Sequence, residues 1–161
     1  MPDVMNRPLR KSHKQVFESA AAQDILDRGQ VLRLAMCSGD QPYLVPLNYV
    51  HDQGRIYLHT GRQGLKMEFL RANPKVCFEV TVDVELLPSA LPCKWNCAFR
   101  SVLGFGRVVE VEDPSERRRG LEMIVTRYAG PGPHRLAAEA AERVCVLRLD
   151  IESLTCKHNL P

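Results

Sequence analysis

Apolar and polar residues alternate along much of this chain with the two-residue period of a β-strand. Six segments show this alternation, or a short apolar run, together with β-branched and aromatic residues. These segments are residues 31–37, 43–50, 55–60, 76–82, 99–111 and 144–151. Turn-forming clusters at Ser38–Pro42 and His51–Gly54 separate the first three segments, so the pattern predicts an antiparallel meander there.

Proline and glycine mark irregular positions in or between these strands. Pro46 has no N–H group, so its strand must lie at a sheet edge or contain a bulge at that position. Gly104 and Gly106 predict a bulge or sharp curvature in the long strand 99–111. The segment 86–96 contains two prolines and is expected to be irregular.

Four segments have helical spacing instead, and they are residues 16–28, 65–72, 113–128 and 137–142. Gly29 follows the first segment at a position typical of a helix C-terminus, and Asn73–Pro74 ends the second. The third begins at Asp113 with Pro114 in its first turn, where proline is favoured. Six strands with these short helices, joined mostly by short turns, predict a small closed or partly open barrel.

The chain length of 161 residues fits one domain. We expect residues 1–15 to form a flexible N-terminal arm and residues 16–161 to form a single domain. The chain lacks the GxGxxG sequence and the strand–helix alternation of a dinucleotide-binding βαβ fold. It also lacks the GxxxxGK[ST] phosphate loop, so the sequence excludes both of these nucleotide-binding folds.

Composition and charge exclude several other classes of protein. Hydrophobic residues make up 45% and charged residues 25% of the chain, which excludes intrinsic disorder. The net charge of +3 comes from charges interspersed along the chain, without the basic stripe of a nucleic-acid-binding protein. No apolar run approaches the ~20 residues of a membrane span, and the polar N-terminus does not resemble a secretory signal. We therefore expect a cytoplasmic protein with no nucleic-acid or membrane partner.

The cysteines and the paired carboxylates form no recognisable reactive site. The six cysteines are Cys37, Cys77, Cys93, Cys97, Cys145 and Cys156. Reduced thiols are expected in the cytoplasm, and the CxxxC pair Cys93 and Cys97 lacks a second pair to complete a zinc site. No metal site is therefore expected. Glu110 and Glu112 share one strand face and are expected at a solvated edge.

The segment 57–66 is the most informative for chemistry. A strand ends in His59–Thr60, a loop with two glycines follows, and a helix begins near Gly64. Backbone N–H groups at a helix N-terminus favour an anion, and the Thr60 hydroxyl with Arg62 and Lys66 would add further anion ligands. This composition is typical of a phosphate cradle, although a plain strand–loop–helix connection with solvated basic residues also has it. His59 is either a cofactor-facing residue or a hydrogen-bonded histidine at a strand end.

A second candidate region precedes the long strand. It contains the single tryptophan, Trp95, followed by Phe99, Arg100 and Ser101. Core packing and one salt bridge would explain these residues, but Arg100 and Ser101 could also supply a second set of anion donors. The chain shows no catalytic triad and no nucleophile elbow.

Together these segments resemble the pyridoxamine-5′-phosphate-oxidase-like superfamily of FMN-binding split β-barrels, and in particular its branch of 5-nitroimidazole-resistance (Nim-type) proteins. The resemblance spans about residues 24–130, and the order and spacing of the motifs both match the family. The residues that carry it are Pro42–Tyr49, Ile56–Thr60, Gly64–Lys66, Asn73–Phe78 and Phe99–Gly106. The resemblance implies a mainly β chain with short helices, folded as a six-stranded, Greek-key-like split β-barrel.

The resemblance also implies a homodimer with two flavin sites at the subunit interface. One subunit would lay a strand along the flavin ring, with the residues Val45, Pro46, Leu47, Asn48 and Tyr49. The same subunit would hold the flavin phosphate and ribityl chain with His59, Thr60, Leu65 and Lys66. The partner subunit would contribute Trp95, Phe99, Arg100 and Ser101. His59 corresponds to a histidine that is linked to activity in Nim-type proteins, so we expect it to be the catalytic residue.

The sequence departs from the oxidase in the loop before the second helix. The oxidase carries Ser-Arg-Lys there, and this chain carries Gly64–Leu65–Lys66. One cationic and one hydroxyl ligand are lost, so either Arg62 compensates or flavin affinity is lower. The substrate-binding arginine and histidine of the oxidase have no convincing counterpart in residues 144–161, so pyridoxal phosphate synthesis is not expected.

The resemblance implies an FMN-dependent oxidoreductase, with FAD or haem as less favoured cofactors. A reduced small-molecule donor would reduce the flavin, and the flavin would reduce a small acceptor such as a nitroaromatic or a quinone. Three alternatives remain open from the sequence. The protein is a flavin carrier or sensor without turnover, a haem-binding split barrel with His59 or His158 as axial ligand, or a barrel without cofactor that serves as an interaction module.

Overall fold

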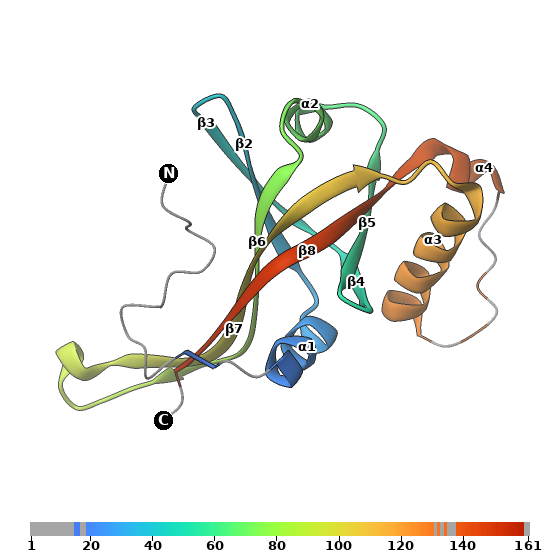
Figure 1. Ribbon diagram of the computed structural model, residues 1–161. Helices are drawn as coiled ribbons and strands as arrows, with labels where there is room; N and C mark the ends of the chain where they lie inside the picture. The colour runs from blue at the N-terminus through green and yellow to red at the C-terminus, as the bar shows by residue number, and fades with distance from the viewer. Residues whose placement is uncertain (1–14, 17–18, 131, 133, 135–137, 160–161) are drawn as a thin grey trace.

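The computed structural model describes residues 15–16, 19–130, 132, 134 and 138–159 (Figure 1). Eight antiparallel strands form one sheet: β1 (Gln15–Val16), β2 (Leu32–Ser38), β3 (Gln41–Leu47), β4 (Tyr49–Asp52), β5 (Arg55–Gly61), β6 (Lys75–Leu87), β7 (Asn96–Glu110) and β8 (Val144–Asn159). The helices are α1 (Ser19–Arg28), α2 (Leu65–Ala72), α3 (Pro114–Ala129) and α4 (Ala138–Arg143), with one 3₁₀ turn, η3 (Pro92–Lys94). None of the helices in these ranges has the length and hydropathy needed to cross a membrane.

Strands β3 and β4 are consecutive in the chain but lie at opposite edges of the sheet. The strand order is β3-β2-β6-β7-β8-β5-β4, with β1 paired to the end of β8. Only Asn48 separates β3 from β4, so the chain itself bridges the two edges. The sheet therefore curls into a barrel that stays split, because its two edge strands, β3 and β4, do not pair with each other (Figure 1).

The structure confirms the mainly β split barrel but divides its strands differently from the prediction. Both hairpins of the predicted antiparallel meander are present, as β2–β3 and β4–β5, but the predicted middle strand 43–50 is broken at Asn48 into β3 and β4, which lie at opposite edges of the sheet. The short strand β1 was also not predicted, and Gln15, which we placed in the N-terminal arm, begins it. The first predicted helix begins at Ser19, because Val16 belongs to β1. Residues 1–14 of the predicted arm lie outside the described residues.

The core lies inside the barrel and beneath the helices. Alternate strand residues such as Leu34, Leu58 and Phe78 are completely or almost completely buried and pack together. Helices α1 and α2 add Leu26 and Met67 to the same core. Burying a large apolar side chain stabilises the fold by about 1.5–3 kcal/mol, so this interior is the main source of stability.

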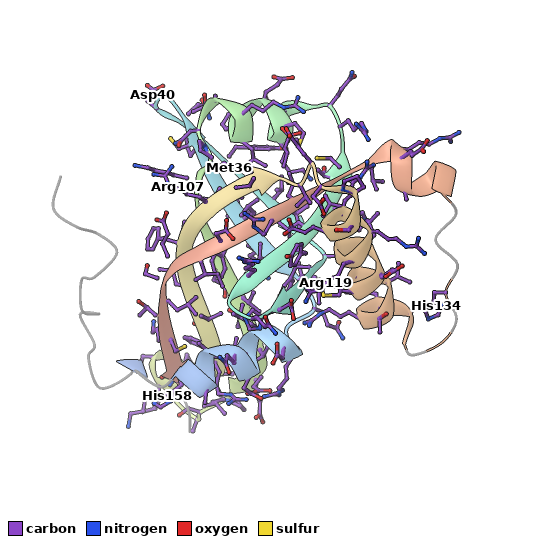
Figure 2. The ribbon with its side chains drawn as sticks, turned by 45° about the vertical axis from the view of Figure 1, so that its right-hand side comes forward. Met36, Asp40, Arg107, Arg119, His134 and His158 are labelled. Atoms are coloured by element: carbon purple, nitrogen blue, oxygen red, sulfur yellow. The ribbon has the colours of Figure 1, made fainter. Side chains whose placement is uncertain are left out.

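Helix α3 packs on the outer face of the barrel, where Leu121 and Ile124 cover Tyr57 of β5. It begins where the sequence predicts, since the Asp113 side chain accepts a hydrogen bond from the Glu116 N–H at 2.7 Å. Figure 2 shows Arg119 projecting from this helix, and its guanidinium is 2.6 Å from the Asp52 carboxylate at the β4–β5 turn. These contacts hold β5 in place, and β5 leads directly into the candidate site.

The strands β6 and β7 extend beyond the barrel as a long hairpin (Figure 1). The segment 86–96, predicted to be irregular, is partly regular, because Leu86 pairs with Cys97 and Leu87 with Asn96. The tip of the hairpin, residues 84–95, exposes four large apolar side chains: Val84, Leu86, Leu91 and Trp95. We call this segment the hairpin tip. Such a cluster on a protruding element is typical of an interaction surface.

Candidate functional site

Strand β5 has different neighbours along its length. Residues Arg55–Leu58 pair with β4 on one side and β8 on the other, whereas His59–Gly61 pair with β8 alone. The β4 pairing ends at Tyr49 opposite Leu58, and the chain then turns away through Asn48 into β3. The backbone of His59–Gly61 is therefore open on the side of the split, where backbone groups can bind a ligand.

Helix α2 begins four residues after this open edge. Its N-cap residue is Gly64, with φ 111° and ψ 168°, a conformation that side-chain-bearing residues rarely adopt. No side chain caps the helix. Leu65 and Lys66 are its first two residues, and their N–H groups have no acceptor within the helix. The start of α2 therefore presents backbone donors and the positive end of the helix dipole.

Lys66 and His59 add side chains to this arrangement. No carboxylate pairs with either residue within the described part of the chain. Burial lowers the pKa of the Lys66 ammonium group. The pKa of the His59 imidazole is also lowered, first by loss of hydration around the ring, although the residue as a whole is exposed, and then by the positive charge of Lys66. A partly desolvated cation without a counter-ion is costly and favours a bound anion.

Replacing Lys66 by methionine should raise the pKa of His59 in the protein without ligand. The substitution removes the positive charge that disfavours the imidazolium, while the loss of hydration around the ring remains. An NMR titration of the imidazole protons measures this change. Lys75→Met, at the first residue of β6, is a control that removes the same charge elsewhere and should leave the titration unchanged. An unaltered His59 pKa in Lys66→Met would show that the two side chains do not interact.

The same coupling predicts how stability depends on pH. His59 has a lower pKa in the folded state than the unfolded value of about 6.5, so the unfolded chain takes up a proton first as pH falls. The free energy of unfolding therefore decreases as pH falls below about 6.5. Urea unfolding at pH 7 and pH 5 should show a smaller decrease for Lys66→Met than for the original protein.

The residues expected along the flavin ring differ in their exposure to solvent. Pro46 and Asn48 are exposed, and Val45 and Leu47 are half-buried against the core. Pro46 lies in the edge strand β3, as its missing N–H requires. Tyr49 is fully buried, and its backbone N–H donates to the Tyr128 hydroxyl at 2.9 Å. Pro46 and Asn48 are therefore the residues of this strand best placed to meet a ligand at the surface.

Arg62 is engaged elsewhere. Its guanidinium donates from Nε and Nη2 to the Glu142 carbonyl oxygen, at 3.0 and 2.7 Å. The prediction that Arg62 replaces the missing cationic phosphate ligand is therefore not supported by its position. The candidate cradle consists instead of the open β5 edge, the start of α2 and the Lys66 ammonium group.

The second predicted group of site residues lies at the other end of the barrel. Thr60 pairs with Cys145 near the start of β8, and Ser101 pairs with Lys157 near its end. Twelve residues of strand separate Cys145 from Lys157, which corresponds to roughly 40 Å along β8. Trp95 and Phe99 lie farther along in the same direction. A single chain therefore does not bring the two groups together.

The sequence pattern does not identify the residues that form ion pairs with Arg100. Its guanidinium is 2.8 Å from the Asp83 carboxylate and 2.8 Å from the Asp24 carboxylate. Arg28 contacts both of these carboxylates, so four charged residues from three elements form one network. Asp83 has a positive φ of 57° at the irregularity in β6, and a sequence pattern cannot place that backbone turn.

A family model described as pyridoxamine 5′-phosphate oxidase matches residues 18–158. The chain belongs to the pyridoxamine 5′-phosphate oxidase family. An uncharacterised protein of Rhizobium meliloti (strain 1021) is 36% identical over 66 residues, a match that spans 41% of this chain and 43% of that protein. The similarity to this curated relative therefore covers less than half of its length.

Solved structures of the same fold support this membership of the pyridoxamine 5′-phosphate oxidase family. A Bacteroides thetaiotaomicron protein described as a 5-nitroimidazole antibiotic resistance protein superposes with a TM-score of 0.79 at 23% identity, covering 89% of this chain and 86% of that chain. A protein of Mycobacterium smegmatis described as binding FAD and haem superposes with a TM-score of 0.80 at 16% identity, covering 92% and 74%. At these identities the likeness establishes the fold alone.

Proposed function

We propose that this protein binds a flavin, FMN in particular, and is an oxidoreductase that passes electrons from a reduced donor to a small acceptor. The observation that carries the proposal is the unpaired, partly desolvated Lys66 beside the free N–H groups of α2 and the open edge of β5. Together these groups suit a terminal phosphate. The fold supports the choice of ligand, since a structural relative binds FAD and haem.

The residues present fit the cofactor at the phosphate end. The Lys66 ammonium group and the backbone N–H groups of Leu65 and Lys66 would hold the phosphate oxygens. Thr60 belongs to the part of β5 that pairs on one side only and is half-buried, and its hydroxyl would donate a further hydrogen bond. A phosphate dianion would restore the charge balance around Lys66 and raise the pKa of His59 towards its ordinary value.

A bound flavin supplies two-electron redox chemistry, and the chain supplies binding, orientation and exclusion of water. His59 stands on the outer face of β5 at the split, between the proposed phosphate site and Asn48. Its imidazole is mainly neutral at pH 7 even if the phosphate raises its pKa back to the ordinary value of about 6.5, so it can accept or donate a hydrogen bond there. We propose that His59 holds a proton near the reacting end of a small acceptor, such as a nitroaromatic or a quinone.

We further propose that the protein is a homodimer with a flavin at the subunit interface. The two groups of predicted site residues lie at opposite ends of β8, and a two-fold axis would place the end of one copy beside the start of the other. Trp95, Phe99, Arg100 and Ser101 of one copy would then complete the cradle of the other. The exposed apolar side chains of the hairpin tip suit burial in such an interface.

The protein is proposed to act in the cytoplasm, where its six free cysteines remain reduced. A haem-binding function is the alternative that the relatives raise. His59 and His158 cannot ligate one haem within a single chain, because His59 of β5 pairs with Val146 near the start of β8, whereas His158 lies near the end of β8. Haem would therefore need one histidine from each copy or a single axial ligand.

Titration of the purified protein with FMN, FAD and riboflavin tests the proposal. We expect FMN to bind at least about tenfold more tightly than riboflavin, which corresponds to about 1.4 kcal/mol from the phosphate. Flavin fluorescence measures the affinities, and anaerobic bleaching by a nicotinamide donor then tests turnover. Equal affinities for FMN and riboflavin would contradict the phosphate site. A Soret band without flavin binding would show that the cofactor is haem and not flavin.

A further inference from the structure

The loop that leads into the cradle, residues 61–64, borders a cavity. The cavity, of about 620 Å³, lies behind it, bordered by Arg62 of the loop, Arg71 of α2, Glu110 of β7 and Cys145 of β8. Gly61 and Gly64 have no side chains to pack into this space. The loop therefore has little apolar packing beneath it, and polar contacts decide its position.

Two arginines make those polar contacts. Arg62 donates two hydrogen bonds to the Glu142 carbonyl oxygen at the end of α4. The Arg62 carbonyl oxygen accepts a hydrogen bond from Arg71 Nη2 at 3.3 Å. The loop is thus held at one residue, Arg62, by a side-chain contact with α4 and a backbone contact with α2.

Arg71 is itself fixed by Glu110. The two side chains form a bidentate ion pair, with Nε to Oε1 at 2.7 Å and Nη2 to Oε2 at 3.1 Å. Cys145 Sγ lies 3.6 Å from Glu110 Oε2 on the other side of the carboxylate. Glu110 was expected at a solvated strand edge, and its side chain is 38% exposed there; the sequence did not show that α2 places Arg71 directly against it.

We propose that Arg62 and Arg71, with Glu110 behind them, are positioning residues for the phosphate cradle and do not contact the phosphate. They fix the loop 61–64 and thereby the direction of the free N–H groups of Leu65 and Lys66. This inference rests on the proposed flavin-binding function. It replaces the sequence-based expectation that Arg62 is itself a phosphate ligand.

The test compares Arg62→Gln and Glu110→Gln, each of which removes a contact that holds the loop. Both variants should bind FMN about three- to tenfold more weakly, with riboflavin affinity unchanged within twofold, the size expected for one or two lost hydrogen bonds. The double variant should lose no more than about the larger single loss, because the two contacts hold the same residue. Arg62→Lys should recover part of the loss, since an ammonium group can still reach the Glu142 carbonyl oxygen.

Arg119→Gln is the matched control. It removes an arginine that also pairs with a carboxylate, at 2.6 Å, but on α3 and away from the loop, so it should leave both affinities unchanged. In the protein without flavin, amide hydrogen exchange of residues 61–66 should accelerate in Arg62→Gln and Glu110→Gln but not in Arg119→Gln.

The outcomes separate three explanations. Weakened FMN binding in Arg62→Gln alone, with normal binding in Glu110→Gln, would make Arg62 a direct phosphate ligand and overturn the inference. Lower thermal stability with an unchanged ratio of FMN to riboflavin affinity would show a purely structural role and also overturn it. An original protein that binds FMN and riboflavin equally would contradict the proposed function itself, before any variant is measured.

Discussion

Replacing Lys66 by methionine is expected to weaken FMN binding by about 1.5–3 kcal/mol, or roughly 10- to 150-fold, and to leave riboflavin binding unchanged. Lys66 is the cation at the start of α2, and no carboxylate pairs with it among the described residues. Its charge is therefore available to a phosphate and is already partly desolvated, as its lowered pKa indicates. Methionine keeps most of the apolar stem, so packing around the site should change little.

Fluorescence titration with both flavins measures this effect. Lys75→Met removes the same charge at the start of β6, after the helix has ended, and should leave both affinities as they are. Raising the salt concentration should weaken FMN binding to the original protein more than to Lys66→Met, because salt screens the lost interaction. Equal losses for FMN and riboflavin would show that Lys66 acts on the flavin ring or on the fold and not on the phosphate.

Replacing Gly106 by alanine is expected to lower the free energy of unfolding by about 3 kcal/mol, the upper part of the range for overpacking. An added Cβ would lie 2.3 Å from the Asp150 carbonyl oxygen and 3.0 Å from Leu149 Cδ2. The first of these atoms is backbone of β8, which cannot rotate away. Gly106 sits where the register between β7 and β8 shifts, so the close approach is built into the curvature of the barrel.

Urea unfolding followed by circular dichroism measures this loss. Gly61→Ala is the control, since its Cβ would have no atom nearer than 3.9 Å and its φ is not positive. That variant should be neutral or slightly more stable, because alanine restricts the unfolded chain more than glycine does. A Gly106→Ala protein as stable as the original would show that β7 and β8 can move apart at the bulge.

Local chemistry made several features predictable from the sequence. Asp113 and Pro114 marked the start of α3 because capping needs only neighbouring residues. Pro46 predicted an edge or a bulge because a missing N–H cannot be compensated in a central strand, and β3 is an edge strand. The spacing from His59 to Lys66 predicted the strand–loop–helix that forms the cradle, since each element is short and continuous in the chain.

Features that depend on distant partners could not be predicted in this way. The chain breaks at Asn48 because β3 pairs with β2 whereas β4 pairs with β5. The residue pattern on both sides of Asn48 is nevertheless that of one continuous strand. Arg62 looked like a phosphate ligand because the sequence does not show that the Glu142 carbonyl lies within its reach. A salt bridge was one explanation for Arg100, but its partners could not be named for the same reason, since Asp24 and Asp83 are far from it in the chain.

The single-residue junction at Asn48 also constrains the order in which the chain can fold. The hairpins β2–β3 and β4–β5 form from neighbouring residues, but they become parts of one sheet only after β6, β7 and β8 have assembled between them. The two early hairpins, joined at Asn48, therefore cannot enter one sheet until β8 is present, and β8 begins nearly a hundred residues later at Val144. Such non-local pairing slows folding and leaves strand edges exposed meanwhile. Synthesis of the last strand is thus the event that commits this chain to its native topology.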